Sequence, residues 1–150
     1  MKRAGFSPQT EQIIRQAGLL ARELGHSYVG TEHLLLAILQ QRELACCRSL
    51  ARGGWDAAAL RGFLALRTGR GCARLPVPQG LSPGARQVLY QARADAARLR
   101  MRRIEPEHLL LAICRRAQCT AARLLVSGGT DLNCVFSDAY DSLRCPAAGE

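Results

Sequence analysis

The strongest constraint on the fold of this chain is an internal repeat with a constant offset of 75 residues. The segment that begins at Phe6 aligns without gaps with the segment that begins at Leu81, and the run EHLLLAI is identical at residues 32–38 and 107–113. One offset kept this far along the chain predicts two copies of one structural unit. Because each half is small for a core of its own, we expect the two to pack as one body. Further matches are Ala17 with Ala92, Leu24 with Leu99, Arg48 with Arg123, Leu50 with Leu125, Gly53-Gly54 with Gly128-Gly129, and Asp56 with Asp131.

Each repeat is predicted to form helices. Ser7 is an N-cap residue, Pro8 suits the first helical position, and Gly25 suits a helix C-terminus. No segment shows convincing strand alternation, and aromatic residues make up only 5% of the chain. Between Ser7 and Gly25 the apolar positions follow a helical period: Ile13, Ile14, Ala17, Leu20, Ala21 and Leu24.

The predicted fold class is all-α, with two four-helix repeats packed as a pseudo-twofold eight-helix domain. In the first repeat, Thr31 caps the second helix and Asp56 the fourth, which extends through about Leu66. The last helix of the second repeat, from Leu132 to Leu143, has the weakest pattern. The expected core side chains are Leu34, Leu35, Ile38, Leu109, Leu110 and Ile113. The expected segments are repeat one at 6–67 with its third helix from Leu44 to Ala51, a Gly- and Pro-rich linker at 68–80, repeat two at 81–143, and a tail at 144–150.

Arginine dominates the charge of the chain. The net charge is +9, and Lys2 is the one lysine among 21 basic residues. A P-loop needs a lysine after a glycine-rich loop, so the chain is not expected to be an ATPase or a lysine-dependent enzyme. We expect a binding module and not an enzyme. Such charge favours either a solvated arginine surface or an acidic or nucleic-acid partner. The two densest basic runs are Arg61, Arg67, Arg70 and Arg74, and Arg98, Arg100, Arg102 and Arg103.

The cysteines point to a reducing compartment. There are seven, an odd number, and no apolar signal segment precedes them, so a cytoplasmic location is expected. Because no CxxC occurs, we interpret them mainly as small apolar residues on helix faces, with a metal site as the minor alternative. No cofactor, metal ion or membrane segment is expected. The cysteines are Cys46, Cys47, Cys72, Cys114, Cys119, Cys134 and Cys145.

The doubled pattern F-S-P…L-G-H…V-G-T-E-H-L-L-L-A-I-L, over about residues 6–143, resembles the N-terminal repeat domain of Clp-type AAA+ unfoldases of the ClpC/ClpA kind. That resemblance implies an eight-helix pseudo-twofold domain that docks adaptors and receives substrates ahead of ATPase modules. In some Gram-positive members this domain binds phosphorylated arginine. The ATPase modules themselves have no counterpart in this sequence.

The resemblance implies a phosphoarginine-type ligand at Ser7 and Glu32, with Ser82 and Glu107 as the repeated pair. A carboxylate can accept the guanidinium, and a free helix N-terminus favours the phosphate. We expect the two residues of each pair to lie close together, since 25 residues separate them in both repeats. The alternative is structural, because Ser is an ordinary N-cap and Glu an ordinary first-turn residue. The second pair departs from the pattern, because Glu105-Pro106 replaces Gly30-Thr31.

Three functions remain open from the sequence. The first is a protein-interaction module that binds adaptors or substrate proteins of a Clp system, with a Clp ATPase as a further partner. The second is a basic nucleic-acid-binding protein that uses the run from Arg98 to Arg103, although stacking aromatics are few. The third is an enzyme with cysteine or metal chemistry. His33 and His108 invite a catalytic role, but their apolar neighbours favour packed, hydrogen-bonded structural histidines.

Overall fold

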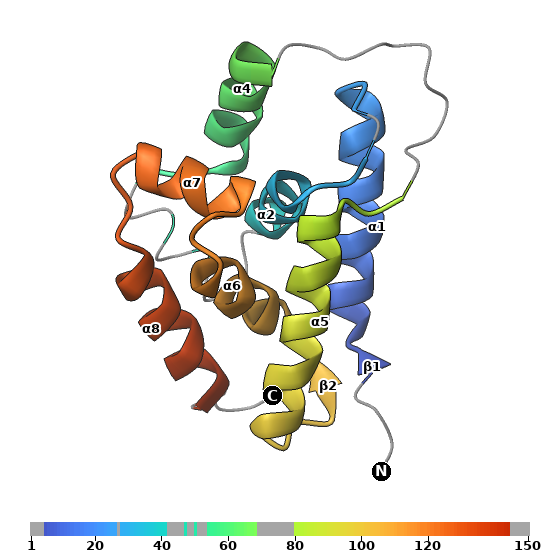
Figure 1. Cartoon of the computed structure of the whole chain (residues 1–150), viewed down its shortest axis with the longest axis vertical. Helices are drawn as coiled ribbons and strands as arrows, with labels where there is room; N and C mark the ends of the chain where they lie inside the picture. The colour runs from blue at the N-terminus through green and yellow to red at the C-terminus, as the bar shows by residue number, and fades with distance from the viewer. Residues whose placement is uncertain are drawn as a thin grey trace.

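The computed structural model describes residues 5–26, 28–41, 47, 50, 54–68 and 80–144, and these are almost entirely helical (Figure 1). The all-α prediction is confirmed. Most of the predicted third helix of repeat one, most of the predicted linker, and Cys46, Cys72 and Cys145 lie outside the described residues. The elements are β1 (Gly5–Phe6), α1 (Pro8–Glu23), α2 (Thr31–Gln40), α4 (Ala57–Thr68), α5 (Pro83–Arg98), β2 (Arg103–Ile104), α6 (Pro106–Arg115), α7 (Thr120–Ser127) and α8 (Leu132–Arg144).

The long helices α1 and α5 begin in the same way. The Ser7 side chain accepts a hydrogen bond from the Thr10 N–H at 3.2 Å, and the Ser82 side chain accepts one from the Ala85 N–H at 3.1 Å. A proline follows each serine at the first helical position. Both serines are therefore N-caps, as the sequence predicts.

Two short parallel pairings join the repeats crosswise. Phe6 of β1 pairs with Ile104 of β2, and the isolated bridge between Val29 and Leu81 is its counterpart at the 75-residue offset. In each case the segment that leads into the long helix of one repeat pairs with the segment before the second helix of the other. The sequence shows no strand alternation here, because two residues are too few to form an alternating pattern.

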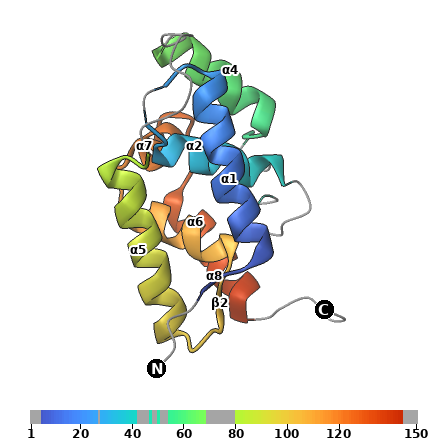
Figure 2. The ribbon, with the colours of Figure 1, turned by 90° about the vertical axis from the view of Figure 1, so that its right-hand side faces the viewer.

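The central helices α2 and α6 carry the repeated run and form the middle of the core. Figures 1 and 2 show them enclosed by the other helices, with α1 and α5 along the outside. α2 packs against α1, and α6 packs against α5 and α8. No described helix has the length and apolar character needed to cross a membrane. The six predicted core side chains are all fully buried: Leu34, Leu35, Ile38, Leu109, Leu110 and Ile113.

Two helix starts show how the repeats depend on each other. Asp56 caps α4 as predicted, because its Oδ1 accepts a hydrogen bond from the Ala59 N–H at 2.7 Å. The prediction that Thr31 caps α2 is wrong: Gly30 is the N-cap, and Thr31 is the first residue of the helix. The Thr31 hydroxyl instead accepts a hydrogen bond from the Ala121 N–H, at 3.0 Å, in the first turn of α7. A side chain of repeat one thus completes a helix end in repeat two.

Candidate functional site

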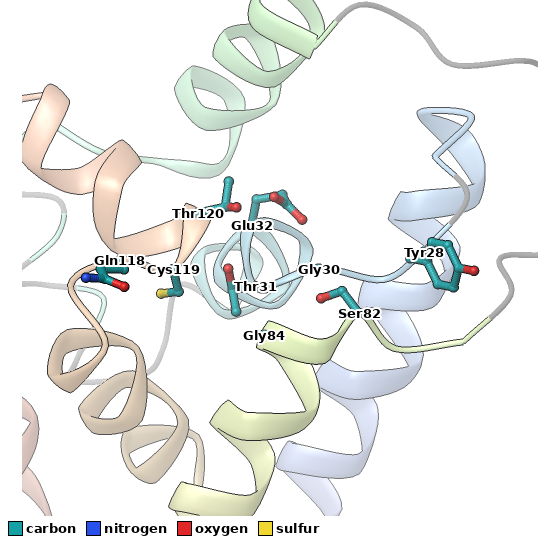
Figure 3. A pocket seen from close by; sticks show the side chains of 9 residues that line it. All are labelled: Tyr28, Gly30, Thr31, Glu32, Ser82, Gly84, Gln118, Cys119 and Thr120. Carbon is teal, nitrogen blue, oxygen red and sulfur yellow. The ribbon is translucent and has the colours of Figure 1, made fainter.

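Three helix N-termini converge on one pocket of about 420 Å³ between the repeats (Figure 3). The first N–H groups of a helix lack partners within the helix, and they carry the positive end of its dipole. Three such ends favour a negatively charged group in the space between them. The lining residues are Gly30, Thr31 and Glu32 at the start of α2, Ser82 and Gly84 at the start of α5, Gln118, Cys119 and Thr120 at the start of α7, and Tyr28 at the edge.

Glu32 is the acidic side chain among the described residues that line this pocket. A Cβ placed on residue 30 would overlap the Glu32 carboxylate, so glycine at this position lets the side chain fold back over the backbone. Burial raises the pKa of the Glu32 carboxyl, and hydrogen bonds from its own backbone N–H and from the Thr120 side chain act in the opposite direction. The carboxylate is 16% exposed and remains open to the pocket.

Two histidines support the backbone behind Glu32. His33 Nδ1 accepts a hydrogen bond from the Gly30 N–H at 2.9 Å, so the proton of the neutral ring lies on Nε2. That nitrogen lies 2.7 Å from His26 Nδ1 and donates to it. Burial, and then repulsion from His26, lower the pKa of His33 to about 4. His33 and His108 are both buried, and Nδ1 of each ring accepts a backbone hydrogen bond, as expected for packed histidines.

The charges in this pocket suit a ligand that carries both signs. At neutral pH the His33 ring is uncharged, although its Nδ1 lies 3.4 Å from Glu32 Oε1. Within the described part of the chain, no arginine forms an ion pair with Glu32. The carboxylate is therefore available to a cationic group, while the three helix ends beside it suit an anionic one.

The structure brings Glu32 together with a serine of the other repeat, so the expectation that Ser7 lies close to Glu32 is wrong. Ser82, not Ser7, lines the pocket with Glu32. Ser7 lies beside β2, where its backbone N–H donates to the Ile104 carbonyl at 3.1 Å. The reason is geometric: α1, which has 16 residues, extends about 24 Å between Ser7 and the loop that leads to Glu32.

The described positions around Glu107 differ from those around Glu32. Glu107 is half-buried in the first turn of α6, on the side where Ser7 contacts β2. Glu105 stands where repeat one has Gly30. Because a Cβ at position 30 would overlap the folded-back Glu32 carboxylate, the Cβ of Glu105 is expected to block the same conformation of Glu107. Gln9 likewise stands at the position of Gly84. Ser7 and Glu107 are therefore a weaker candidate for the same ligand.

Gly84, Cys119 and Thr120 are pocket residues that the sequence analysis missed. Their counterparts at the 75-residue offset are Gln9, Leu44 and Ala45, so the repeat gave no signal for them. Cys119 is the N-cap of α7, since its Sγ accepts a hydrogen bond from the Ala122 N–H at 3.5 Å, and the prediction of an apolar residue on a helix face is wrong for it.

Cys47, by contrast, is buried as predicted. The described residues contain no cluster of three His, Cys, Asp or Glu side chains that could hold a metal ion.

The fold and site define a class of protein: an all-helical domain of two repeats with a pocket between them. The chain belongs to the Clp repeat (R) N-terminal domain family, whose model matches residues 5–128. It is 34% identical over 134 residues to chloroplastic chaperone protein ClpC1 of Oryza sativa subsp. japonica, covering 87% of this chain and 15% of that protein. The chloroplastic ClpC of Pisum sativum is 33% identical over 132 residues, with 86% and 14% covered. The chain therefore spans about a seventh of the length of these relatives.

Solved structures share the fold. The N-terminal domain of ClpD from Arabidopsis thaliana superposes with a TM-score of 0.75 at 18% identity, covering 93% of this chain and 94% of that one. The Hsp104 N-terminal domain from Candida albicans has a TM-score of 0.73 at 19% identity, with 93% and 91% covered. A ClpV N-domain solved in complex with a VipB peptide has a TM-score of 0.67 at 20% identity, with 89% and 88% covered.

Proposed function

We propose that this chain is a protein-interaction module of a Clp chaperone system, which binds adaptor or substrate proteins in the pocket beside Glu32. The observation that carries this proposal is the convergence of the N-termini of α2, α5 and α7 around one available carboxylate. Family membership supports it, and so does the shared fold of a ClpV N-domain that was solved with a bound peptide. A Clp ATPase is the partner that would act on the captured protein.

The ligand chemistry that best matches the pocket is a phosphorylated arginine side chain. Its guanidinium can pair with the Glu32 carboxylate, and its phosphate can accept hydrogen bonds from those N–H groups at the starts of the surrounding helices that no side chain caps. The Ser82 hydroxyl lines the same space. Unmodified arginine would satisfy the carboxylate and leave the helix ends without an anion, so the pocket should prefer the phosphorylated form.

Calorimetric titration of phosphoarginine, with arginine as the comparison ligand, tests this proposal. Glu32→Ala should weaken binding about tenfold to a hundredfold, because a charge-assisted hydrogen bond contributes ~1.5–3 kcal/mol. Glu107→Ala is the matched control in the second repeat and should have a much smaller effect. Equal affinity of wild type for the two ligands would remove phosphoarginine as the ligand.

Gly84→Gln gives an independent test of the same pocket, since it installs the residue found at the matching position of repeat one. A Cβ at position 84 makes only ordinary contacts, 3.9 Å from Thr31 Cγ2 and 4.0 Å from Ser82 Oγ, so the fold should tolerate it. The longer side chain would fill the pocket. We expect loss of phosphoarginine binding with a midpoint of urea unfolding that is unchanged or raised, because glycine within a helix is destabilising.

A further inference from the structure

The Glu32 pocket continues along α5 into a second and a third depression. The second is lined by Arg115 and Arg116 and shares Gly84, Gln118 and Cys119 with the Glu32 pocket. Arg116 in turn joins the second depression to the third. We call these two depressions the basic trough, which is defined by Arg86, Gln87, Tyr90, Gln91, Arg115 and Arg116.

The positive charge of the trough comes from arginine side chains, two of which are fixed by contacts with neighbouring side chains. Arg115 donates to Asp95 Oδ1 at 2.9 Å and lies over the Phe136 ring at 5.4 Å, and the Asp95 carboxylate beneath it is buried. Arg116 donates to the Gln87 side chain. Because Asp95 already pairs with Arg115, the uncompensated charge of the trough comes from Arg86 and Arg116.

No acidic side chain lines the trough among the residues that the structure describes. Its complement is therefore a negatively charged segment. The Gln87 carbonyl already accepts from Arg116 and the Gln91 NH2 already donates to Asp95 Oδ1 at 3.2 Å, which leaves the Gln87 NH2 and the Gln91 carbonyl for a peptide backbone. Tyr90, which is 75% exposed, offers an apolar surface. A groove for single-stranded nucleic acid would instead present several aromatic side chains for base stacking, and this trough has Tyr90 alone among its lining residues.

We infer that the basic trough binds acidic residues that flank the residue held in the Glu32 pocket, and so selects substrate or adaptor segments with acidic flanks. The inference rests on the proposed function, because the position of the acidic residues is counted from the residue held in the Glu32 pocket. From Gly84 to Gln91 the trough extends about 10 Å along α5, which an extended peptide covers with about three residues. The acidic side chains should therefore lie within about two to four positions of the residue in the pocket.

Fluorescence anisotropy with four labelled peptides tests the inference. The peptides carry a central phosphoarginine or arginine, with either glutamate or glutamine at two, three and four positions on both sides. The trough variant is Arg86→Gln/Arg116→Gln. The matched control is Arg102→Gln/Arg103→Gln, which removes the same charge from two exposed residues of the same repeat. Circular dichroism verifies that both variants are folded.

Wild type should bind the glutamate peptides about threefold to tenfold more tightly than the glutamine peptides, since each exposed ion pair contributes a small factor. This preference should disappear in the trough variant, persist in the control variant and decline with added salt. Equal affinity for glutamate and glutamine peptides, or an equal loss in both variants, would overturn the inference. So would an oligouridine that binds as tightly as the glutamate peptides through Arg86 and Arg116.

The two proposals fail differently in this experiment. If the phosphorylated and unmodified peptides bind with equal affinity while the glutamate preference still depends on Arg86 and Arg116, the phosphoarginine proposal is wrong and the inference about the basic trough is supported. If phosphorylation matters but the flanking residues do not, the pocket stands and the trough falls.

Discussion

Arg100 has a left-handed backbone conformation. Its counterpart at the 75-residue offset is Gly25, which has the same conformation but no side chain. Gly25 has φ of 72° and Arg100 has φ of 57°. A residue with a Cβ is disfavoured in this region by ~1–2 kcal/mol, whereas glycine adopts it readily. We therefore expect Arg100→Gly to raise the free energy of unfolding by about 1 kcal/mol in urea titrations. Arg100→Ala is the control, because it removes the same charge and keeps the Cβ. Equal stabilisation by both would assign the effect to charge.

A second residue-scale prediction concerns His33, whose pKa is lowered to about 4 from 6.5 by burial. Between these values the unfolded chain binds a proton that the folded chain does not, so stability should fall as the pH falls from 6.5 to 4. The full contribution is about 3 kcal/mol, present above pH 6.5. Protonation would also place a hydrogen on His33 Nδ1, which could then no longer accept the hydrogen bond from the Gly30 N–H.

The measurement compares urea unfolding of wild type and His33→Gln at intervals across this pH range. The stability difference between the two proteins should shrink as the pH falls. The pKa of Glu32 is raised by burial, so its protonation favours the folded state at low pH and acts in the opposite direction. Both proteins retain Glu32, so its contribution largely cancels. A constant difference would show that His33 does not titrate in this way.

Among the elements, α2 and α6 contribute most to the core, and a truncation in either should be costly. Leu35 and Leu110 are completely buried. Leu35→Ala or Leu110→Ala should lower the free energy of unfolding by ~2–5 kcal/mol through lost burial and the cavity that remains. Leu19 in α1 is 49% exposed, and Leu19→Ala makes the same chemical change outside the core. A loss as large for Leu19→Ala as for Leu35→Ala would contradict this assignment.

The sequence predicted the elements well because helix caps and apolar periodicity are local signals. Ser7, Ser82 and Asp56 each cap the helix that follows, as predicted. The prediction was wrong for Thr31, because its hydroxyl accepts a hydrogen bond from the first turn of a helix in the other repeat. The partner of such a group lies far away along the chain, so no local pattern reveals it. The two-residue strands were missed because they are too short to show an alternating pattern.

At the scale of the whole molecule, the crosswise pairing explains which part of the site could be predicted. The family resemblance implied Glu32 and Ser82 as site residues, and these two line one pocket. The 75-residue offset does not indicate whether the serine beside each glutamate comes from the same repeat or from the other one. The parallel pairing of β1 with β2 decides this, because it places Ser7 beside the second repeat. The pocket consequently belongs to neither repeat alone.

The same crosswise pairing predicts that neither half of the chain folds by itself. Separately produced residues 1–75 and 76–150 would each lose a strand partner, and α7 would lose the hydrogen bond that its Ala121 N–H donates to Thr31. Each half is also too small to bury much apolar surface. We expect each to lack a cooperative thermal transition by circular dichroism, and an equimolar mixture to regain one with a midpoint that rises with concentration. The intact chain cleaved at a protease site inserted between residues 75 and 76 is the control and should stay folded. Cooperative unfolding of either half alone would show that each repeat is an independent domain.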